Sequence, residues 1–309
     1  MQITNNILMI RPVNFRMNEQ TAVNNYFQED IDLKNKEINS RAQAEFDAFV
    51  RVLREKGVNV IVMEDRKEVD TPDAVFPNNW ISFHEDGTVG LYPLFAENRR
   101  KERREDVLDV LEEKGFVIRN IMDYTAAEAE ELFLEATGVM ILDRENQKAY
   151  CALSQRADED LLIEFCEDFE FTPVVFTAYQ SVNGGRKPIY HTNVMMCLAE
   201  TFAVICLDSI DDNKEKKNVV SHLKKDGKEI IAITEAQMHQ FAGNMLQVLG
   251  MGNKRLLVMS TTAYESLRPD QIAAIEKHCE IVHSSLDTIE TCGGGSARCM
   301  MAEVFLPKE

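Results

Sequence analysis

The sequence lacks the features typical of metal-binding, membrane-spanning or nucleic-acid-binding proteins. It contains no Cys-x-x-Cys or His-x-x-x-His pair, which argues against a zinc site and a metal-dependent hydrolase. No stretch approaches the roughly 20 apolar residues of a membrane helix. Basic residues are in the minority, with 34 Lys and Arg against 52 Asp and Glu. Because phosphate binding needs a basic surface, we expect no nucleic-acid partner.

Cysteine is sparse, and its distribution does not suggest a disulfide framework. The seven cysteines are scattered over positions 151, 166, 197, 206, 279, 292 and 299. The first residues, MQITNNILMIRPVNF, have neither the basic start nor the apolar run of a secretion signal. We therefore expect a cytoplasmic protein whose cysteines are free thiols.

The segment ETCGGGSARCMM, residues 290–301, combines two of these cysteines with three glycines. A disulfide between Cys292 and Cys299 does not fit the cytoplasmic expectation. A phosphate loop would end in Gly-Lys-Ser or Gly-Lys-Thr, which this segment does not. The remaining interpretation is a loop whose glycines allow close backbone approach to a ligand and which presents one reactive thiol.

One structural unit recurs five times along the chain. Amphipathic helices followed by apolar strands are predicted at 41–56, 99–114, 156–169, 213–226 and from Pro269 onward, several ending at a glycine. After each comes a short polar segment and a further strand. Aligned on the residue before that strand, the five segments share the positions Asn79, Gly138, Asn193, Asn244 and Cys299.

The aligned positions are separated by 59, 55, 51 and 55 residues, a spacing typical of a repeat architecture. Repeats of this kind can close around an axis, where the five positions would meet. Asparagine often caps the turn before a strand, which explains any one of them. A packed core does not favour several polar residues at equivalent positions. Because His191 and Glu135 lie beside these positions in the sequence, we predict that together they form a functional site.

The motifs YHTNV, FLEATG and GGGSARCMM resemble those of the amidinotransferase, or guanidino-group-modifying, superfamily. The likeness runs from MIRPVNF to RCMMAEVF and is strongest to the citrulline-utilisation hydrolase branch. The resemblance implies an α/β fold, namely one five-bladed pseudo-symmetric α/β propeller of ββαβ-type units over residues 1–309. It also implies a central Cys–His–Glu site without cofactor or metal.

The resemblance assigns roles to individual residues of this chain. Cys299 matches the nucleophile, His191 the general acid and base, and Glu135 the carboxylate of the family's Glu-Gly-Gly-Asp segment. Asn79 matches the aspartate of a Phe-x-Arg-Asp segment that binds the guanidinium. Cys292 remains a rival nucleophile, although it lies before the glycines and not at an aligned position.

The chain departs from the family where deiminases carry aspartate, at Asn79, Gly138 and Asn193. A guanidinium offers only N–H donors and matches carboxylates, whereas a neutral ureido group offers a carbonyl acceptor as well as donors. An asparagine amide also offers both. We therefore expect an amino-acid substrate with a ureido group, with citrulline hydrolysed to ornithine, ammonia and carbon dioxide.

The substrate carboxylate is expected to meet an arginine. Arg186, which follows two glycines and precedes His191, is the first candidate, and Arg298 is another; Asn193 and Asn244 complete the expected binding set. Three alternatives remain open: an arginine deiminase-like enzyme, an amidinotransferase, and a non-catalytic binding protein similar to translation initiation factor 6. A homo-oligomer is possible.

Overall fold

Five three-stranded sheets with the same strand order form the framework of the protein. The computed structural model describes all 309 residues, and in each sheet the middle strand pairs antiparallel with one neighbour and parallel with the other. The sheets are β3(Ile81–Phe83)–β4(Thr88–Leu91)–β5(Asn120–Asp123), β6(Met140–Asp143)–β7(Lys148–Leu153)–β8(Thr172–Thr177), β11(Met196–Leu198)–β12(Phe202–Ile205)–β13(Glu229–Ala232), β14(Leu246–Leu249)–β15(Arg255–Ser260)–β16(Glu280–Ser284), and β17(Ala302–Glu303)–β1(Asn6–Arg11)–β2(Asn59–Glu64).

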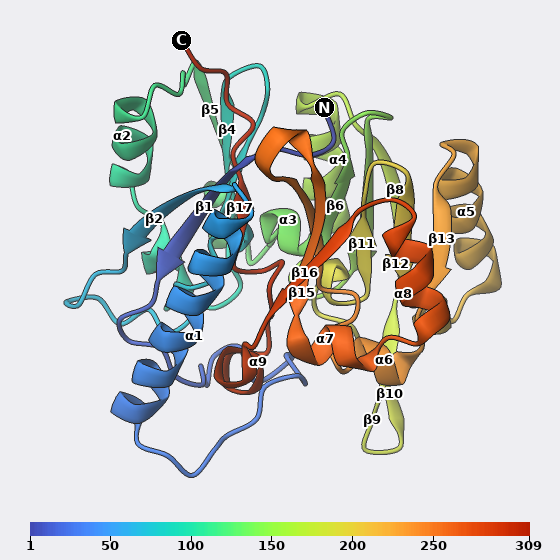
Figure 1. Cartoon of the computed structure of the whole chain (residues 1–309), viewed down its shortest axis with the longest axis horizontal. Helices are drawn as coiled ribbons and strands as arrows, with labels where there is room; N and C mark the ends of the chain where they lie inside the picture. The colour runs from blue at the N-terminus through green and yellow to red at the C-terminus, as the bar shows by residue number, and fades with distance from the viewer.

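A helix precedes the third strand of every sheet, which makes the parallel pairing possible. These helices are α1 (Asn35–Glu55), α2 (Asp106–Glu113), α4 (Glu159–Asp168), α5 (Asn213–Lys225) and α8 (Pro269–Glu276), the last preceded by α7 (Thr261–Ser266). In Figure 1, α2 lies at the left edge and α5 at the right edge of the molecule, outside the strands. The remaining elements are α3 (Ala136–Val139), α6 (Glu235–Met238), α9 (Asp287–Gly293) and a projecting hairpin, β9 (Tyr179–Val182) and β10 (Gly185–Pro188).

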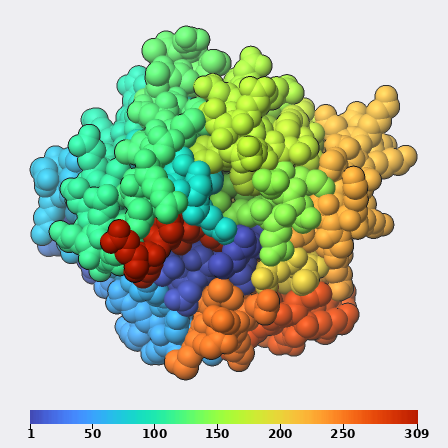
Figure 2. All heavy atoms as spheres, turned by 90° about the horizontal axis from the view of Figure 1, so that it is seen from above, coloured from blue at the N-terminus to red at the C-terminus, as the bar shows by residue number.

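The two ends of the chain complete one sheet together. β17, near the C-terminus, pairs antiparallel with β1, near the N-terminus, so that Ile7 lies opposite Glu303 and Leu8 opposite Ala302. Seen from above, the segments of the chain follow one another around the molecule in sequence order (Figure 2). None of the helices combines the length and the apolar character needed to cross a membrane.

The expected α/β class and the repeated strand–strand–helix–strand unit are confirmed. Three of the helices end where expected, at glycines with positive φ: Gly57 (85°), Gly115 (81°) and Gly227 (73°). Two helix starts were wrong. α1 begins at Asn35, six residues before the predicted position 41. The helix predicted at 99–114 begins only at Asp106, and residues 99–102 form a separate 3-10 turn. That turn carries Arg99, which is buried, instead of an exposed helical face.

The aligned residues all lie two or three positions before the first strand of a sheet. Asn79 and Asn193 end or occupy 3-10 turns before β3 and β11, and Gly138 lies in α3 before β6. Asn244 directly follows a turn before β14, and Cys299 occupies a turn before β17. All five residues are therefore presented at equivalent ends of their sheets.

Candidate active site

The structure brings the five aligned positions together around the sulfur of Cys299. Asn193 and Asn244 donate their side-chain N–H groups to Sγ of Cys299, over 3.3 Å and 3.2 Å. Asn244 also donates to the backbone oxygen of Asn193 at 2.9 Å. A side chain at Gly138 would begin 2.3 Å from Nδ2 of Asn79 and 3.0 Å from Nδ1 of His191. The glycine is therefore the only residue that fits between the two.

Glu135 and His191 form a buried pair beside this cluster. Nε2 of His191 donates to Oε2 of Glu135 at 2.6 Å, and Oε1 accepts from the backbone N–H of Phe95 at 3.0 Å. Glu135 is 0% exposed and His191 is 2% exposed. Because a carboxylate can only accept, it fixes the proton of the neutral imidazole on Nε2 and leaves Nδ1 as the basic nitrogen.

Two arginines determine the charge state of this pair. Burial alone would raise the pKa of Glu135, but Arg156, the hydrogen bond from His191, and Arg99 together hold it below its usual range. Burial lowers the pKa of His191 to about 4, although Glu135 opposes this effect. At neutral pH the pair is therefore a carboxylate next to a neutral imidazole.

Cys299 rests as a thiol. Burial raises its pKa, while the amide of Asn244, the backbone at Ser296, the charge of Arg298 and the amide of Asn193 act in the opposite direction. These donors are already aimed at the sulfur, so they stabilise the thiolate once a base has removed the proton. The site thus combines a thiol that receives two amide N–H groups with a neutral imidazole held by a carboxylate.

The Gly-rich loop lies against Cys299 and is held by other parts of the chain. Gly293 and Gly295 line the same small cavity as Cys299 and His191. A side chain at Gly295 would begin 3.0 Å from the Phe76 ring and 3.3 Å from Cβ of Cys299, so the close approach requires glycine. Tyr190 donates its hydroxyl to the backbone oxygen of Gly294 at 2.5 Å.

Three charged residues of the cavity were missed by the sequence analysis: Asp73, Arg99 and Arg156. Oδ2 of Asp73 accepts from Asn18 and Thr21, whereas Oδ1 is buried without a partner. Asp73 lies only six residues before Asn79, which was the one available signal. Arg99 is hidden in a run of basic residues, and Arg156 in a turn without a motif.

A loop of residues 12–34, here called the covering loop, closes the cavity. From it Asn25 and Gln28 donate to the backbone oxygen of Gly293, and Asn24 accepts from Arg156. The enclosed space holds about one water molecule. The covering loop must therefore move before an amino acid can enter.

Two of the expected substrate contacts need correction. Arg186 lies exposed on the hairpin β9–β10, where it pairs with Asp211 and Glu235, outside the cavity. Its glycines form the hairpin turn and not part of a binding loop. The side chain of Arg298 points away from the cavity and pairs with Glu303 at 3.0 Å. Neither arginine reaches the substrate space.

Asn193, Asn244 and Cys292 also lie outside the cavity lining, although both asparagines contact Sγ of Cys299. Asn244 positions Cys299 through two contacts: its Nδ2 donates to Sγ, and its Oδ1 accepts the backbone N–H of the preceding residue, Arg298, at 3.0 Å. Cys292 is buried in α9 among apolar side chains, and burial raises its pKa to about 11. No group of three or more His, Cys, Asp or Glu side chains is arranged to hold a metal ion.

Comparison with known proteins gives the family. A sequence model described as N,N dimethylarginine dimethylhydrolase, eukaryotic, matches residues 11–306. The chain belongs to this family. This family lies within the guanidino-group-modifying superfamily that the motifs predicted. No curated protein sequence matches the chain.

Solved structures share the fold at low identity. ArgZ, described as an arginine dihydrolase from the ornithine–ammonia cycle in cyanobacteria, is 18% identical with a TM-score of 0.74, covering 98% of this chain but only 41% of ArgZ. Its N-terminal domain, in an asparagine-to-serine variant covalently bound to a reaction intermediate, is 18% identical with a TM-score of 0.70 over 98% and 99% of the chains. A histidine-to-glycine variant of dimethylarginine dimethylaminohydrolase, an adduct with S-methyl-L-thiocitrulline, is 12% identical with a TM-score of 0.64 over 97% and 99%.

The two amide donors at Sγ lead to a prediction about thiol reactivity. We expect iodoacetamide to modify Cys299 with a pH midpoint above the ordinary thiol value of about 8.5, because burial raises its pKa. Asn193→Ala should raise the midpoint further and slow labelling about tenfold at a fixed pH, since the thiolate loses a donor. Peptide mapping by mass spectrometry measures both rates.

Asn78→Ala is the matched control, because Asn78 is buried beside Asn79 but contacts Thr137 instead of the sulfur. It should leave the labelling rate unchanged. Labelling of Cys292 before Cys299, or equal rates in the two variants, would contradict the assignment of the reactive thiol.

Proposed function

We propose that the protein hydrolyses a ureido amino acid, citrulline, to ornithine, ammonia and carbon dioxide through a covalent adduct on Cys299. The observation that carries this proposal is the orientation of the Asn79 amide. Nη1 of Arg99 donates to Oδ1 of Asn79 at 2.9 Å. A guanidinium has no acceptor, so Asn79 must turn its oxygen toward Arg99 and its NH₂ group away.

The NH₂ group of Asn79 has no hydrogen-bond partner. The oxygen Oδ1 of Asn193 has none either, although the NH₂ group of the same side chain donates to Sγ of Cys299. One unpaired donor and one unpaired acceptor therefore flank the reacting position. A ureido carbonyl can accept from Asn79 while a ureido N–H donates to Asn193. A guanidinium, which has only donors, would leave the Asn79 N–H groups unsatisfied.

The remainder of the cavity suits the α-amino and α-carboxylate groups of the substrate. Asp73 offers its unpaired Oδ1 to an ammonium group. Arg99 already uses all three nitrogens on Glu102, Asn79 and Phe76. Arg156 contacts Glu135 only at 3.5 Å, and its other two nitrogens donate to Asn24 and to the backbone oxygen of Thr21 in the covering loop. Because movement of that loop would free these nitrogens, Arg156 is the better partner for the carboxylate.

The chemistry starts from the neutral imidazole of His191 and the neutral thiol of Cys299. Nδ1 of His191 takes the proton of the Cys299 thiol, and the sulfur adds to the ureido carbon while Asn79 donates to the developing oxyanion. Glu135 stabilises the imidazolium, which then protonates the departing nitrogen as the C–N bond breaks. His191 next takes a proton from water, whose oxygen attacks the thiocarbamate carbon, and the departing sulfur takes a proton back from His191 to restore the thiol. The released carbamate then loses carbon dioxide, which frees the second nitrogen as an amine or ammonia.

A second candidate substrate is arginine, because ArgZ, which shares the fold, is described as an arginine dihydrolase. Arginine would lose ammonia first and pass through the ureido stage for which the Asn79 donor is suited. We further infer that the five sheets are the blades of one closed propeller, supported by their common strand order and by the pairing of β1 with β17.

A substrate panel tests the proposed reaction. We expect ornithine from citrulline, with a rate at least about 10⁴-fold lower in Cys299→Ala because the covalent step is lost. Cys292→Ala is the control and should retain the activity. Chromatographic assay of ornithine and citrulline, together with ammonia, measures each product. Citrulline accumulating from arginine without ornithine would contradict the proposal and indicate a deiminase.

Replacing Asn79 tests the substrate class directly. Asn79→Asp puts an acceptor where the NH₂ group was, so the ratio of kcat/KM for citrulline to that for arginine should fall about tenfold or more. Asn78→Asp is the control, because it adds the same charge at the neighbouring residue, which does not line the cavity. It should leave the ratio of the two kcat/KM values unchanged. An unaltered ratio in Asn79→Asp would show that this amide does not select the substrate.

A further inference from the structure

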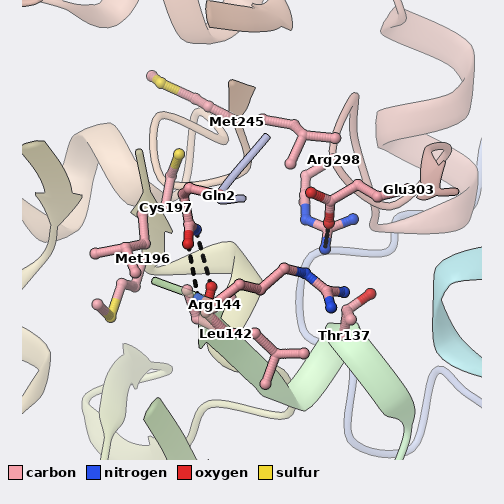
Figure 3. A pocket seen from close by; sticks show the side chains of 12 residues that line it. Gln2, Thr137, Leu142, Arg144, Met196, Cys197, Met245, Arg298 and Glu303 are labelled. Carbon is pink, nitrogen blue, oxygen red and sulfur yellow. Dashed lines mark hydrogen bonds and ion pairs between the residues drawn. The ribbon is translucent and has the colours of Figure 1, made fainter. Parts of the chain in front are cut away.

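A second enclosed space lies behind the layer that carries Cys299. Arg298 and Thr137 line it, whereas the next residues, Cys299 and Gly138, belong to the substrate side. We call this space the rear pocket; it lies next to Gln2 and Glu303, near the two ends of the chain. Its lining has an apolar side with Met196 and Met245 and a charged side with Arg144, Arg298 and Glu303 (Figure 3).

The charges of the rear pocket do not balance. Arg298 is 6% exposed and pairs with Glu303 at 3.0 Å. Arg144, which follows β6, makes no ion pair with any carboxylate. Its guanidinium lies over the Phe305 ring at 4.0 Å, and Nη1 is 3.4 Å from Nδ1 of His84. Two guanidinium groups thus share one carboxylate.

The other neighbours of Arg144 are neutral. Burial holds the pKa of His84 well below its usual range, and Arg144 lowers it further, so His84 carries no compensating charge. Burial also lowers the pKa of Arg144, with Glu303 and Glu85 opposing and Arg298 adding to the effect. Gln2 accepts from the backbone N–H of Arg144 and does not neutralise it. Arg144 is only partly buried, but it lines the rear pocket without a carboxylate partner, and such an uncompensated guanidinium attracts an anion.

We propose that the rear pocket binds a small monovalent anion of the size of chloride between Arg144 and Arg298. Both side chains reach into the pocket from different elements, one after β6 and one before β17 (Figure 3). The free space equals about one or two water molecules. A chloride ion fits it, whereas phosphate or an organic acid does not.

The bound anion acts on Cys299 through Arg298. The charge of Arg298 lowers the pKa of the adjacent thiol. An anion beside Arg298 offsets that charge, so it raises the pKa of Cys299 and slows alkylation at neutral pH, about threefold. Chloride therefore stabilises the fold and weakens the nucleophile, whichever substrate the enzyme uses.

Thermal unfolding in sodium chloride and in sodium gluconate at equal ionic strength tests the proposal, because gluconate is too large for the pocket. The wild-type Tm should be higher in chloride and rise by about 2 °C for each tenfold increase above the dissociation constant. Arg144→Met should abolish the difference. Arg268→Met, which alters an exposed ion pair with Asp270, should preserve it.

Glu303→Gln provides an independent test that does not remove an arginine. Without the competing carboxylate, the chloride-dependent rise in Tm should begin at about tenfold lower concentration, and chloride should slow Cys299 alkylation at the same lower concentration. Equal Tm values in the two salts, or a chloride response that survives in Arg144→Met, would overturn the proposal and leave water as the occupant. A Glu303→Gln response at unchanged chloride concentration would overturn it as well.

Discussion

A fully buried carboxylate, Glu135, is the charge around which the substrate side of the molecule is organised. Its burial would be costly without compensation, and the surrounding groups supply it: His191, Arg156, Arg99 and the backbone N–H of Phe95. The same contacts determine what each of these groups can do. His191 is fixed with its proton on Nε2, which leaves Nδ1 free as the base.

The effect of Glu135 extends through the two arginines. Arg156 connects the carboxylate to Asn24 and to the backbone of Thr21, and so to the covering loop. Arg99 connects it to Asn79 and fixes which end of that amide faces the substrate. Loop closure and substrate selection therefore depend on the same buried charge that holds the base. Cys299 lies between this network and the rear pocket, and the charge of Arg298 on the rear side lowers the pKa of its thiol.

Much of this arrangement could be predicted from the sequence, and the reason is the repeat. The near-regular spacing of Asn79, Gly138, Asn193, Asn244 and Cys299, in steps of 51 to 59 residues, implied equivalent positions in five sheets, and such positions can meet. Residues outside the repeat could not be found in this way. Arg99 resembled a surface cation in a basic helix because nothing in the sequence marks the 3-10 turn that buries it. Arg186 looked functional because glycines precede it, but those glycines serve a hairpin turn.

Charge compensation is the part of the site that sequence spacing cannot reveal. Asp73, Arg156 and the covering loop come from segments far apart in the chain, and only the fold shows that their charges oppose one another. The departures from aspartate at Asn79 and Asn193 could be recognised in the sequence. The sequence does not show which end of the Asn79 amide would face a substrate. In the structure Arg99 donates to Oδ1 of Asn79, which leaves the NH₂ group as the donor toward the cavity.

The most direct test of the account is rapid-quench mass spectrometry of the enzyme during turnover of citrulline, with peptide mapping of the adduct. The account predicts a transient adduct on the peptide that contains Cys299, absent in Cys299→Ala, and its added mass identifies which C–N bond breaks first. An adduct on another residue, or turnover to ornithine without any adduct, would contradict covalent catalysis by Cys299.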